Sequence, residues 1–183
     1  MAWPAAAGLR AAARLRAARS AVVLLVAVLA GCGFQPLYGT TADGSVAADL
    51  ERVRIALISD RLGQELHNAL RDRMNRGGQP ARPLYRLEIG VSESTRRLAI
   101  RKDETTARAN LLVSAIFRLV DAETGAPLMT GKARATSSYN VLDSDFGTLS
   151  AERDAQTRAV RVLADEITVR VSGFFLDRRS AGG

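Results

Sequence analysis

The stretch Ala107–Asp121, ARANLLVSAIFRLVD, decides the fold because hydrophobic residues occupy every second position along it. The odd-numbered positions from 109 to 119 read Ala, Leu, Val, Ala, Phe and Leu. Successive side chains of a β-strand point to opposite faces of a sheet, so this alternation predicts a long strand with one buried face. The even-numbered positions include Leu112 and Ile116 beside polar residues, which predicts that the second face is partly covered.

Strands are also predicted on both sides of this stretch. Residues 85–94, YRLEIGVSES, alternate between apolar and polar side chains in the same way. Residues 121–127, DAETGAP, have the composition of a turn, with Gly125 available for a positive φ angle. Residues 128–140 alternate again and predict the next strand, in which Gly131 is expected to mark a β-bulge.

A fourth strand is predicted nearer the N-terminus, at residues 50–59, LERVRIALIS. Val53, Ile55 and Leu57 lie on one face of it, and arginines lie opposite, which is typical of a half-buried strand.

Two helices are predicted from apolar stripes. The first follows an N-cap at Ser59 or Asp60 and ends at Gly77-Gly78, and its stripe repeats every four residues at Leu62, Leu66, Leu70 and Met74. His67 lies near the edge of this stripe, where a boundary or exposed role is expected. The second follows a loop at 140–149 and an N-cap at Ser150, with a stripe of Val160, Leu163, Ile167, Val171 and Phe174.

The order of these elements is strand, helix, three strands, helix. Three consecutive strands favour a largely antiparallel sheet, and one apolar stripe per helix allows both helices to cover the same sheet face. The predicted fold is therefore α+β, a two-layer sandwich of a four-stranded, mostly antiparallel sheet with two helices on one face. We assign this domain to residues 49–176 and expect residues 177–183 to be a disordered tail.

The N-terminus has the pattern of a secretory signal. Residues 1–20 are rich in Ala and Arg without an acidic residue, and residues 21–30, AVVLLVAVLA, are wholly apolar. This apolar block is too short to span a bilayer, which needs about 20 residues. An organelle transit peptide is the other interpretation, but the uncharged block argues against it. The four arginines of this segment also explain most of the formal charge of +7.

The single cysteine of the chain, Cys32, directly follows the apolar block. Leu29-Ala30-Gly31-Cys32 resembles the bacterial lipobox, which implies acylation of Cys32 and cleavage of residues 1–31. Several acyl chains give a stable membrane anchor. Gly33 after the cysteine favours the outer membrane, since retention in the inner membrane is associated with Asp. The other interpretation is an ordinary cleaved signal with an incidental cysteine, and translation starting downstream of Met1 remains open.

The segment after the cysteine indicates a family. Residues 31–39, GCGFQPLYG, resemble the start of the LPS-assembly lipoprotein LptE, and the order of elements extends the resemblance over most of residues 32–176. Residues 32–48 are then the acylated N-terminal segment and linker. The resemblance implies the two-layer fold, an outer-membrane location on the periplasmic side, an LptD-like β-barrel as partner, and a part in lipopolysaccharide transport.

The residue inventory argues against catalysis. One cysteine excludes an internal disulfide and a cysteine-based zinc site, and a single histidine leaves little material for a metal site or for His-dependent catalysis. No catalytic or phosphate-loop motif occurs. We therefore expect no catalytic residue, metal or cofactor. An enzyme using the loop acids Asp143 and Asp145 is the weaker alternative.

The informative charged stretch is residues 94–108, STRRLAIRKDETTAR, between two predicted strands. Basic residues beside apolar ones suit an amphiphile that carries phosphates and acyl chains, because arginine bridges phosphate oxygens in a fork geometry. Together with the resemblance, this suggests lipopolysaccharide-binding candidates, to which the next strand adds two: Arg96, Arg97, Arg101, Lys102, Lys132 and Arg134. An ordinary hairpin whose charges keep a sheet end soluble would look the same.

Beyond residue 31 the chain is only mildly basic, with 22 Lys and Arg against 19 Asp and Glu. We therefore expect no nucleic-acid partner. The remaining alternative is an accessory lipoprotein of another envelope lipid-transport system, which would share the anchor and the fold.

Overall fold

The structure is a computed structural model that describes residues 46–97 and 107–182. The chain divides into two compact units, Met1–Gly39 and Thr40–Gly183, and the described residues belong to the second. The predicted signal peptide and Cys32, the predicted acylation site, lie outside the described residues, as do Arg101 and Lys102.

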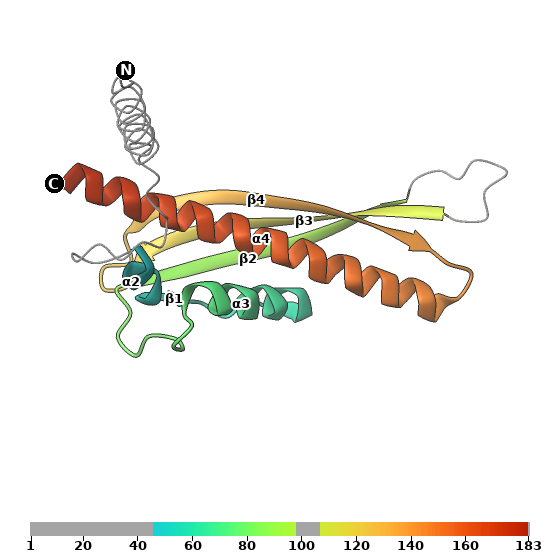
Figure 1. The fold of residues 1–183 in the computed structure, drawn as a ribbon, viewed down its shortest axis with the longest axis horizontal. Coiled ribbons are helices and arrows are strands. Elements are labelled where there is room, and N and C mark those ends of the chain that lie inside the picture. The colour runs from blue at the N-terminus through green and yellow to red at the C-terminus, as the bar shows by residue number, and fades with distance from the viewer. Residues whose placement is uncertain (1–45, 98–106, 183) are drawn as a thin grey trace, which may run out of the picture. The chain divides into compact units, whose positions relative to one another are not determined.

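The second unit contains one mixed sheet and, among the described residues, three helices (Figure 1). The strands lie in the order β1-β2-β3-β4; β1 is parallel to β2, and the other neighbours are antiparallel. The predicted α+β fold with a four-stranded, mostly antiparallel sheet is confirmed. The elements in chain order are α2 (Val46–Glu51), β1 (Val53–Ile55), α3 (Asp60–Met74), β2 (Tyr85–Arg97), β3 (Ala107–Asp121), β4 (Pro127–Val141) and α4 (Asp145–Gly182).

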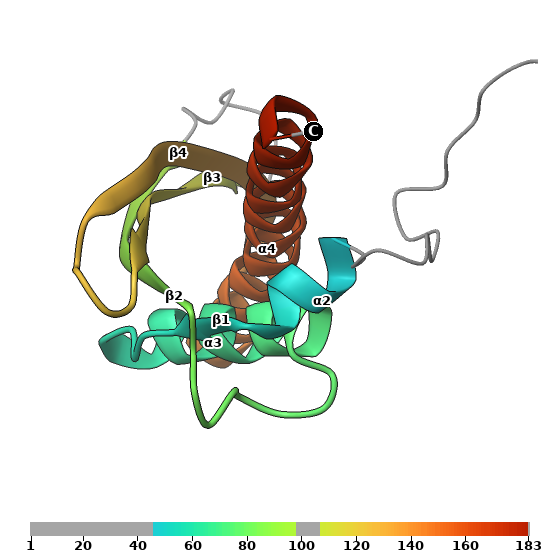
Figure 2. The same cartoon turned by 90° about the vertical axis from the view of Figure 1, so that its left-hand side faces the viewer.

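The core lies between one face of the sheet and the helices α3 and α4, which Figure 2 shows on the concave side of the sheet. The apolar face predicted for 107–121 is buried at every position from Ala109 to Leu119. The α3 stripe is buried as predicted. In α4 the stripe ends with Phe175 buried rather than Phe174, which is only partly covered.

The first predicted strand is shorter than expected. Residues 46–51 form α2, so the helix takes the end of the predicted linker and the start of the predicted strand. The pairing of β1 with β2 ends at Ile55, after which the Ala56 amide donates to the Leu87 carbonyl at 2.9 Å. The chain then leaves the sheet. Leu57, predicted to be in the core, is consequently 91% exposed.

Helix α4 is longer at both ends than predicted. It begins at Asp145, inside the predicted loop and five residues before the expected Ser150 cap, and it continues through the predicted tail to Gly182. At the C-terminal end, the Arg179 Nε donates to the Asp49 carboxylate of α2 at 3.0 Å. This partly buried ion pair gives the last turns of α4 a tertiary anchor that the sequence pattern does not reveal. Among the described residues, no helix has the length and apolar character needed to cross a membrane.

The two outer edges of the sheet differ in what covers them. Side chains of α4 occupy the free edge of β4: the Arg134 amide donates to the Glu166 carboxylate at 3.4 Å, and the Ser138 carbonyl accepts a hydrogen bond from Arg158 at 3.1 Å. On the opposite side, β1 pairs with β2 only over Tyr85–Leu87. The rest of the β2 edge has no strand beside it in the described part of the chain.

Candidate functional site

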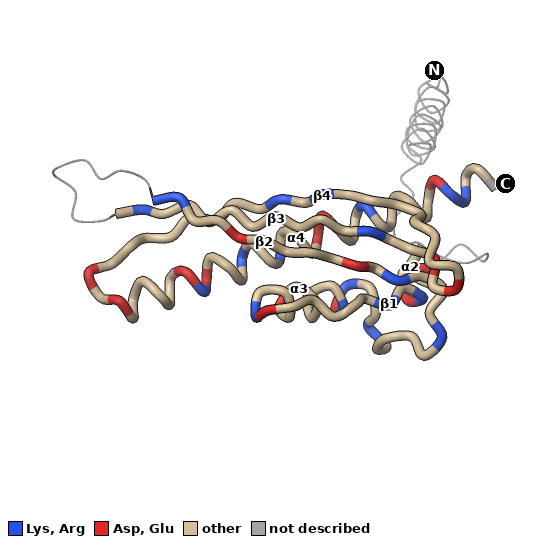
Figure 3. The backbone as a smooth tube through the Cα atoms, turned by 180° about the vertical axis from the view of Figure 1, so that it is seen from behind, with Lys and Arg blue, Asp and Glu red and all other residues tan. Residues whose placement is uncertain are grey.

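Three basic residues, Arg96, Arg97 and Arg108, lie at one end of the sheet, which we call the distal end. It is the end at which β2 stops at Arg97, β3 begins at Ala107 and β4 stops at Val141. Figure 3 shows Lys and Arg at the distal ends of β2 and β3, and acidic residues at the corner between β4 and α4.

Arg96 and Arg108 lie on the same face of the sheet, the one that faces away from the helices. Arg96 is paired in register with Asn110, and Arg108 is two residues before Asn110 on β3. Diagonal neighbours of this kind are about 7–8 Å apart, within reach of long side chains. Both arginines are exposed. The structure therefore brings together one candidate and Arg108, a residue of the charged stretch that was not among the candidates.

Arg97 points to the opposite face because it is the next residue of the strand. It is paired in register with Ala109, which in turn is opposite Tyr139. The burial of Tyr139 raises the pKa of its phenol; the carboxylates of Glu152 and Glu93 add to the rise, whereas the Thr95 hydroxyl and the Arg97 cation oppose it. Arg97 thus belongs to a mixed cluster on the helix side of the sheet rather than to the same surface as Arg96.

Lys132 and Arg134, the two candidates on the following strand, do not lie at the distal end. They lie in the middle of β4, paired with Ile116 and Ser114 of β3. Ser138 of β4 shares a row with Arg96, and it is four residues beyond Arg134, or roughly 13 Å at about 3.3 Å per residue. The separation follows from the register, which the sequence alone did not fix.

These two basic residues adjoin exposed apolar side chains. Ile116 is 61% exposed and Leu112 is 39% exposed on the same outer face, where they are paired with Lys132 and Thr136 of β4. The second face of β3, predicted to be partly covered, is buried at Val120 and exposed at Leu112 and Ile116. The seven ion pairs of the described residues involve none of Arg96, Arg97, Arg108, Lys132 and Arg134.

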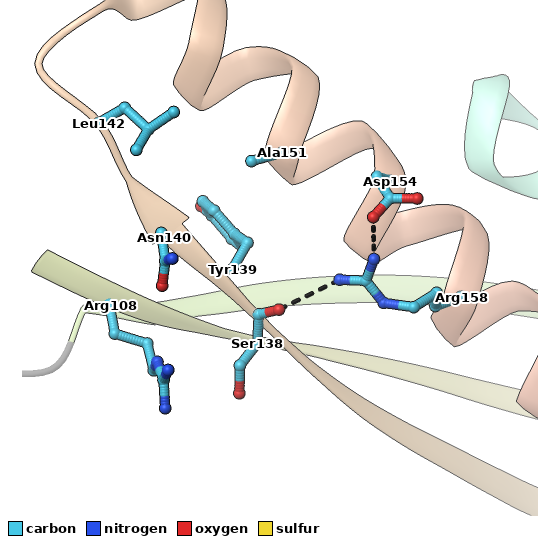
Figure 4. A pocket seen from close by; sticks show the side chains of 8 residues that line it. All are labelled: Arg108, Ser138, Tyr139, Asn140, Leu142, Ala151, Asp154 and Arg158. Carbon is cyan, nitrogen blue, oxygen red and sulfur yellow. Dashed lines mark hydrogen bonds and ion pairs between the residues drawn. The ribbon is translucent and has the colours of Figure 1, made fainter. Parts of the chain in front are cut away.

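A pocket of about 520 Å³ lies beside Arg108, between the end of β4 and the first turns of α4 (Figure 4). Arg158 is engaged there within the protein, since it pairs with Asp154 and donates to the Ser138 carbonyl. The Arg108 guanidinium has no such partner among the described residues. The pocket is lined by Arg108, Ser138, Tyr139, Asn140, Leu142, Ala151, Asp154 and Arg158.

This arrangement suits an anionic group attached to an apolar chain. Arg108 and the Asn140 amide offer hydrogen-bond donors, whereas Leu142 and Ala151 supply apolar surface. Sequence reasoning missed the pocket because its walls come from three elements: the start of β3, the end of β4 and the first turns of α4. Only the packing of α4 along the β4 edge brings them together.

The alternative acidic site has a different environment. Asp143 and Asp145 are both exposed at the corner between β4 and α4, and neither lines the pocket. The described residues contain no group of three or more potential metal ligands close together.

Comparison with solved structures shows the same fold in bacterial lipoproteins. A protein from Caulobacter crescentus described as a lipoprotein has 22% identity, a TM-score of 0.60, and coverage of 73% of this chain and 96% of its own. Uncharacterized lipoprotein B from Nitrosomonas europaea has 20% identity and a TM-score of 0.55, with 75% and 92% coverage. A minor lipoprotein from Acinetobacter baumannii has 16% identity and a TM-score of 0.51, with 67% and 92% coverage.

Sequence comparison identifies the family. No curated protein sequence gives a significant match. The family model LptE, described as lipopolysaccharide-assembly, matches residues 50–171, which is most of the described domain. The chain therefore belongs to the LptE family of lipopolysaccharide-assembly proteins.

Proposed function

We propose that this protein is an outer-membrane lipoprotein, anchored through an acylated Cys32, that assists assembly of an LptD-type β-barrel and plugs it. In that position it takes part in the transport of lipopolysaccharide to the outer leaflet. The observation that carries the proposal is the family match over residues 50–171. The lipobox and the acid-free leader before Cys32 support the anchor.

The distal end supports contact with the transported lipid. Arg96 and Arg108 are exposed, share one face, and have no carboxylate partner among the described residues. Guanidinium groups bind phosphate oxygens through paired hydrogen bonds, and such charge-assisted bonds are stronger than neutral ones. Lipopolysaccharide offers both phosphates and acyl chains, so the pocket beside Arg108 adds apolar surface where a phosphorylated lipid needs it.

Lys132 and Arg134 form a second basic surface on the same outer face. Their neighbours Ile116 and Leu112 give this surface an apolar component that a water-facing sheet does not require. We propose that the lipid reaches it as a separate contact. We further propose that the protein binds and assembles rather than catalyses, and that it uses no cofactor and no nucleic acid.

The first test is isolation of the full-length protein from detergent-solubilised membranes. The proposal expects co-purification of an LptD-type barrel, identified by mass spectrometry, and an acylated N-terminal Cys32. A protein recovered with a free thiol in the aqueous fraction, or without a barrel, would refute the proposal.

The second test compares two variants with equal loss of charge. Arg96→Ser/Arg108→Ser should weaken binding of purified lipopolysaccharide roughly tenfold, as expected for losing one charged hydrogen-bonding contact. The control is Arg76→Ser/Arg82→Ser, which alters two exposed arginines in the connection between α3 and β2. Equal affinities of the two variants would remove the distal end from the lipid site.

A further inference from the structure

The edge of β2 beyond β1 is open over most of its length. Pairing with β1 ends at Leu87, so the segment Ile89–Arg97 has β3 on one side and no strand on the other in the described structure. We call this segment the open edge. Nine residues of strand measure about 30 Å at roughly 3.3 Å per residue.

The register identifies the peptide groups that face outward. The Leu87 carbonyl accepts a hydrogen bond from Ala56 on the β1 side, and the Leu84 carbonyl accepts one from Ala122, which follows β3. The orientation alternates along an antiparallel ladder, and the pairing of β2 with β3 has no irregularity. The amides and carbonyls of the odd-numbered residues Ile89, Val91, Glu93, Thr95 and Arg97 therefore point away from β3.

The side chains do not close this edge either. Residues 92–97 are all exposed, although on the helix side Glu93 accepts a hydrogen bond from Gln156 and Thr95 contacts Tyr139. At the edge of β4, the Glu166 and Arg158 side chains form hydrogen bonds with outward peptide groups. No side chain of the described residues does so along the open edge. Proteins ordinarily block a long free edge with proline, a bulge or a covering element, because it is a template for another strand.

We propose that the open edge is a strand-addition site for an extended, acidic segment of the barrel partner; this inference rests on the proposed function. A row of unpaired peptide groups recognises another extended backbone, which a lipid does not have. Arg96 and Arg97 lie on opposite faces at the end of the edge without a carboxylate partner in the described structure, so a segment carrying Asp or Glu complements them. Glu93 does not supply that partner, since its carboxylate accepts a hydrogen bond from Gln156 at 2.9 Å.

Hydrogen exchange on the wild-type complex tests the backbone pairing directly. The outward amides of Val91, Glu93 and Thr95 should exchange at least about tenfold more slowly in the complex than in the free protein, because each gains an acceptor. The amides of Ser92 and Ser94 serve as internal controls, since they already face β3. Unchanged exchange of the odd-numbered amides in a barrel-containing complex would overturn this inference and leave the proposed function standing.

A matched pair of variants tests its contribution to binding. Thr95→Pro removes an outward amide without removing a hydrogen bond to β3, and edge positions tolerate proline. Thr95→Ala is the control, because both variants lose the hydroxyl that contacts Tyr139. With equal melting temperatures, Thr95→Pro should retain roughly a tenth of the barrel that Thr95→Ala retains, which corresponds to about 1.4 kcal/mol for the lost backbone hydrogen bond.

The other outcomes are also decisive. Equal recovery of the barrel with both variants, together with unprotected amides, would exclude strand addition. If the isolated protein dimerises and its odd-numbered amides become protected as concentration rises, the occupant is a second copy and the barrel segment is excluded. If wild-type protein brings no barrel, the proposed function fails and this inference fails with it.

Discussion

The ring of Phe117 lies over Gly131, the residue directly opposite it on β4. A Cβ atom placed on Gly131 would be 2.3 Å from the Cζ atom of Phe117, a distance that real structures do not show. Phe117 is completely buried, so its ring has no free space into which to move. Glycine at 131 is therefore required by packing; the bulge predicted there is absent, and the irregularity in the ladder lies at Leu119/Val120.

Gly131→Ala should destabilise the domain. Overpacking of a core typically costs about 1–3 kcal/mol of the free energy of unfolding, which urea denaturation would measure. Gly90→Ala is the matched control on the same sheet, because a Cβ there would meet nothing within 4 Å. Its effect should stay within about 0.5 kcal/mol. Equal losses for the two variants would contradict the packing argument.

Gln156→Met should loosen the contact between the two layers. The buried Gln156 of α4 accepts a hydrogen bond from Arg61 of α3 and donates one to Glu93 of β2. Its loss removes two hydrogen bonds to exposed charged partners that water can hydrate, at a cost of about 0.5–1.5 kcal/mol. As a comparison, Arg170→Gln removes only an exposed pair with Glu166 on one helix, worth about 0.3–0.5 kcal/mol. A cost for Gln156→Met no larger than this would show that the bridge is dispensable.

The phenol of Tyr139 should titrate above the ordinary tyrosine pKa of about 10, because burial disfavours the phenolate. A raised pKa in the folded state means that the folded protein binds the proton more tightly. The contribution of Tyr139 to stability is therefore fully present below the unfolded pKa and is lost as pH rises through the folded pKa.

Tyrosinate absorbance, compared between the wild type and Tyr139→Phe, measures this pKa. Arg97→Gln should raise it further, since the Arg97 cation favours the phenolate. A lower pKa in that variant would place Arg97 away from the phenol.

The two basic surfaces of the outer face should act independently in lipopolysaccharide binding. Arg96→Ser/Arg108→Ser and Lys132→Ser/Arg134→Ser change groups that the register separates by roughly 13 Å. Changes in binding free energy at sites farther apart than about 7–10 Å usually add within 0.3–0.5 kcal/mol. Isothermal titration calorimetry of the two double variants and the quadruple variant tests this. The change in binding free energy of the quadruple variant should equal the sum of the changes of the two double variants. A strongly non-additive result would mean that one lipid group bridges both surfaces.

The sequence predicted the main elements because their apolar patterns were long and regular. An alternation over fifteen residues predicts a strand for β3, and the four-residue spacing of Leu62, Leu66 and Leu70 predicts a helix for α3. Short elements were harder: the six residues of α2 overlap the predicted linker and the start of the alternating stretch, and β1 keeps only three residues of that stretch. There, local pattern indicated a single strand, whereas pairing with β2 decided where the strand stopped.

The candidate site was only partly predictable for a related reason. A charged stretch is visible in sequence, but strand register decides which charges share a face. Arg96 and Arg97 are adjacent in the chain and point to opposite faces, whereas Arg96 and Arg108 are distant in the chain and lie together. Sequence also cannot show that α4 seals one edge of the sheet, because that depends on how a helix packs.

The 38 residues of α4 give the domain a length with a physical consequence. At about 1.5 Å per residue the helix measures roughly 57 Å, nearly twice the ~30 Å hydrocarbon thickness of a bilayer. A domain seated upright in a barrel would therefore project past the apolar slab. Under the proposed function, the cluster of Arg96 and Arg108 would then meet a different aqueous compartment from the one that surrounds Arg179, on the opposite side of the membrane.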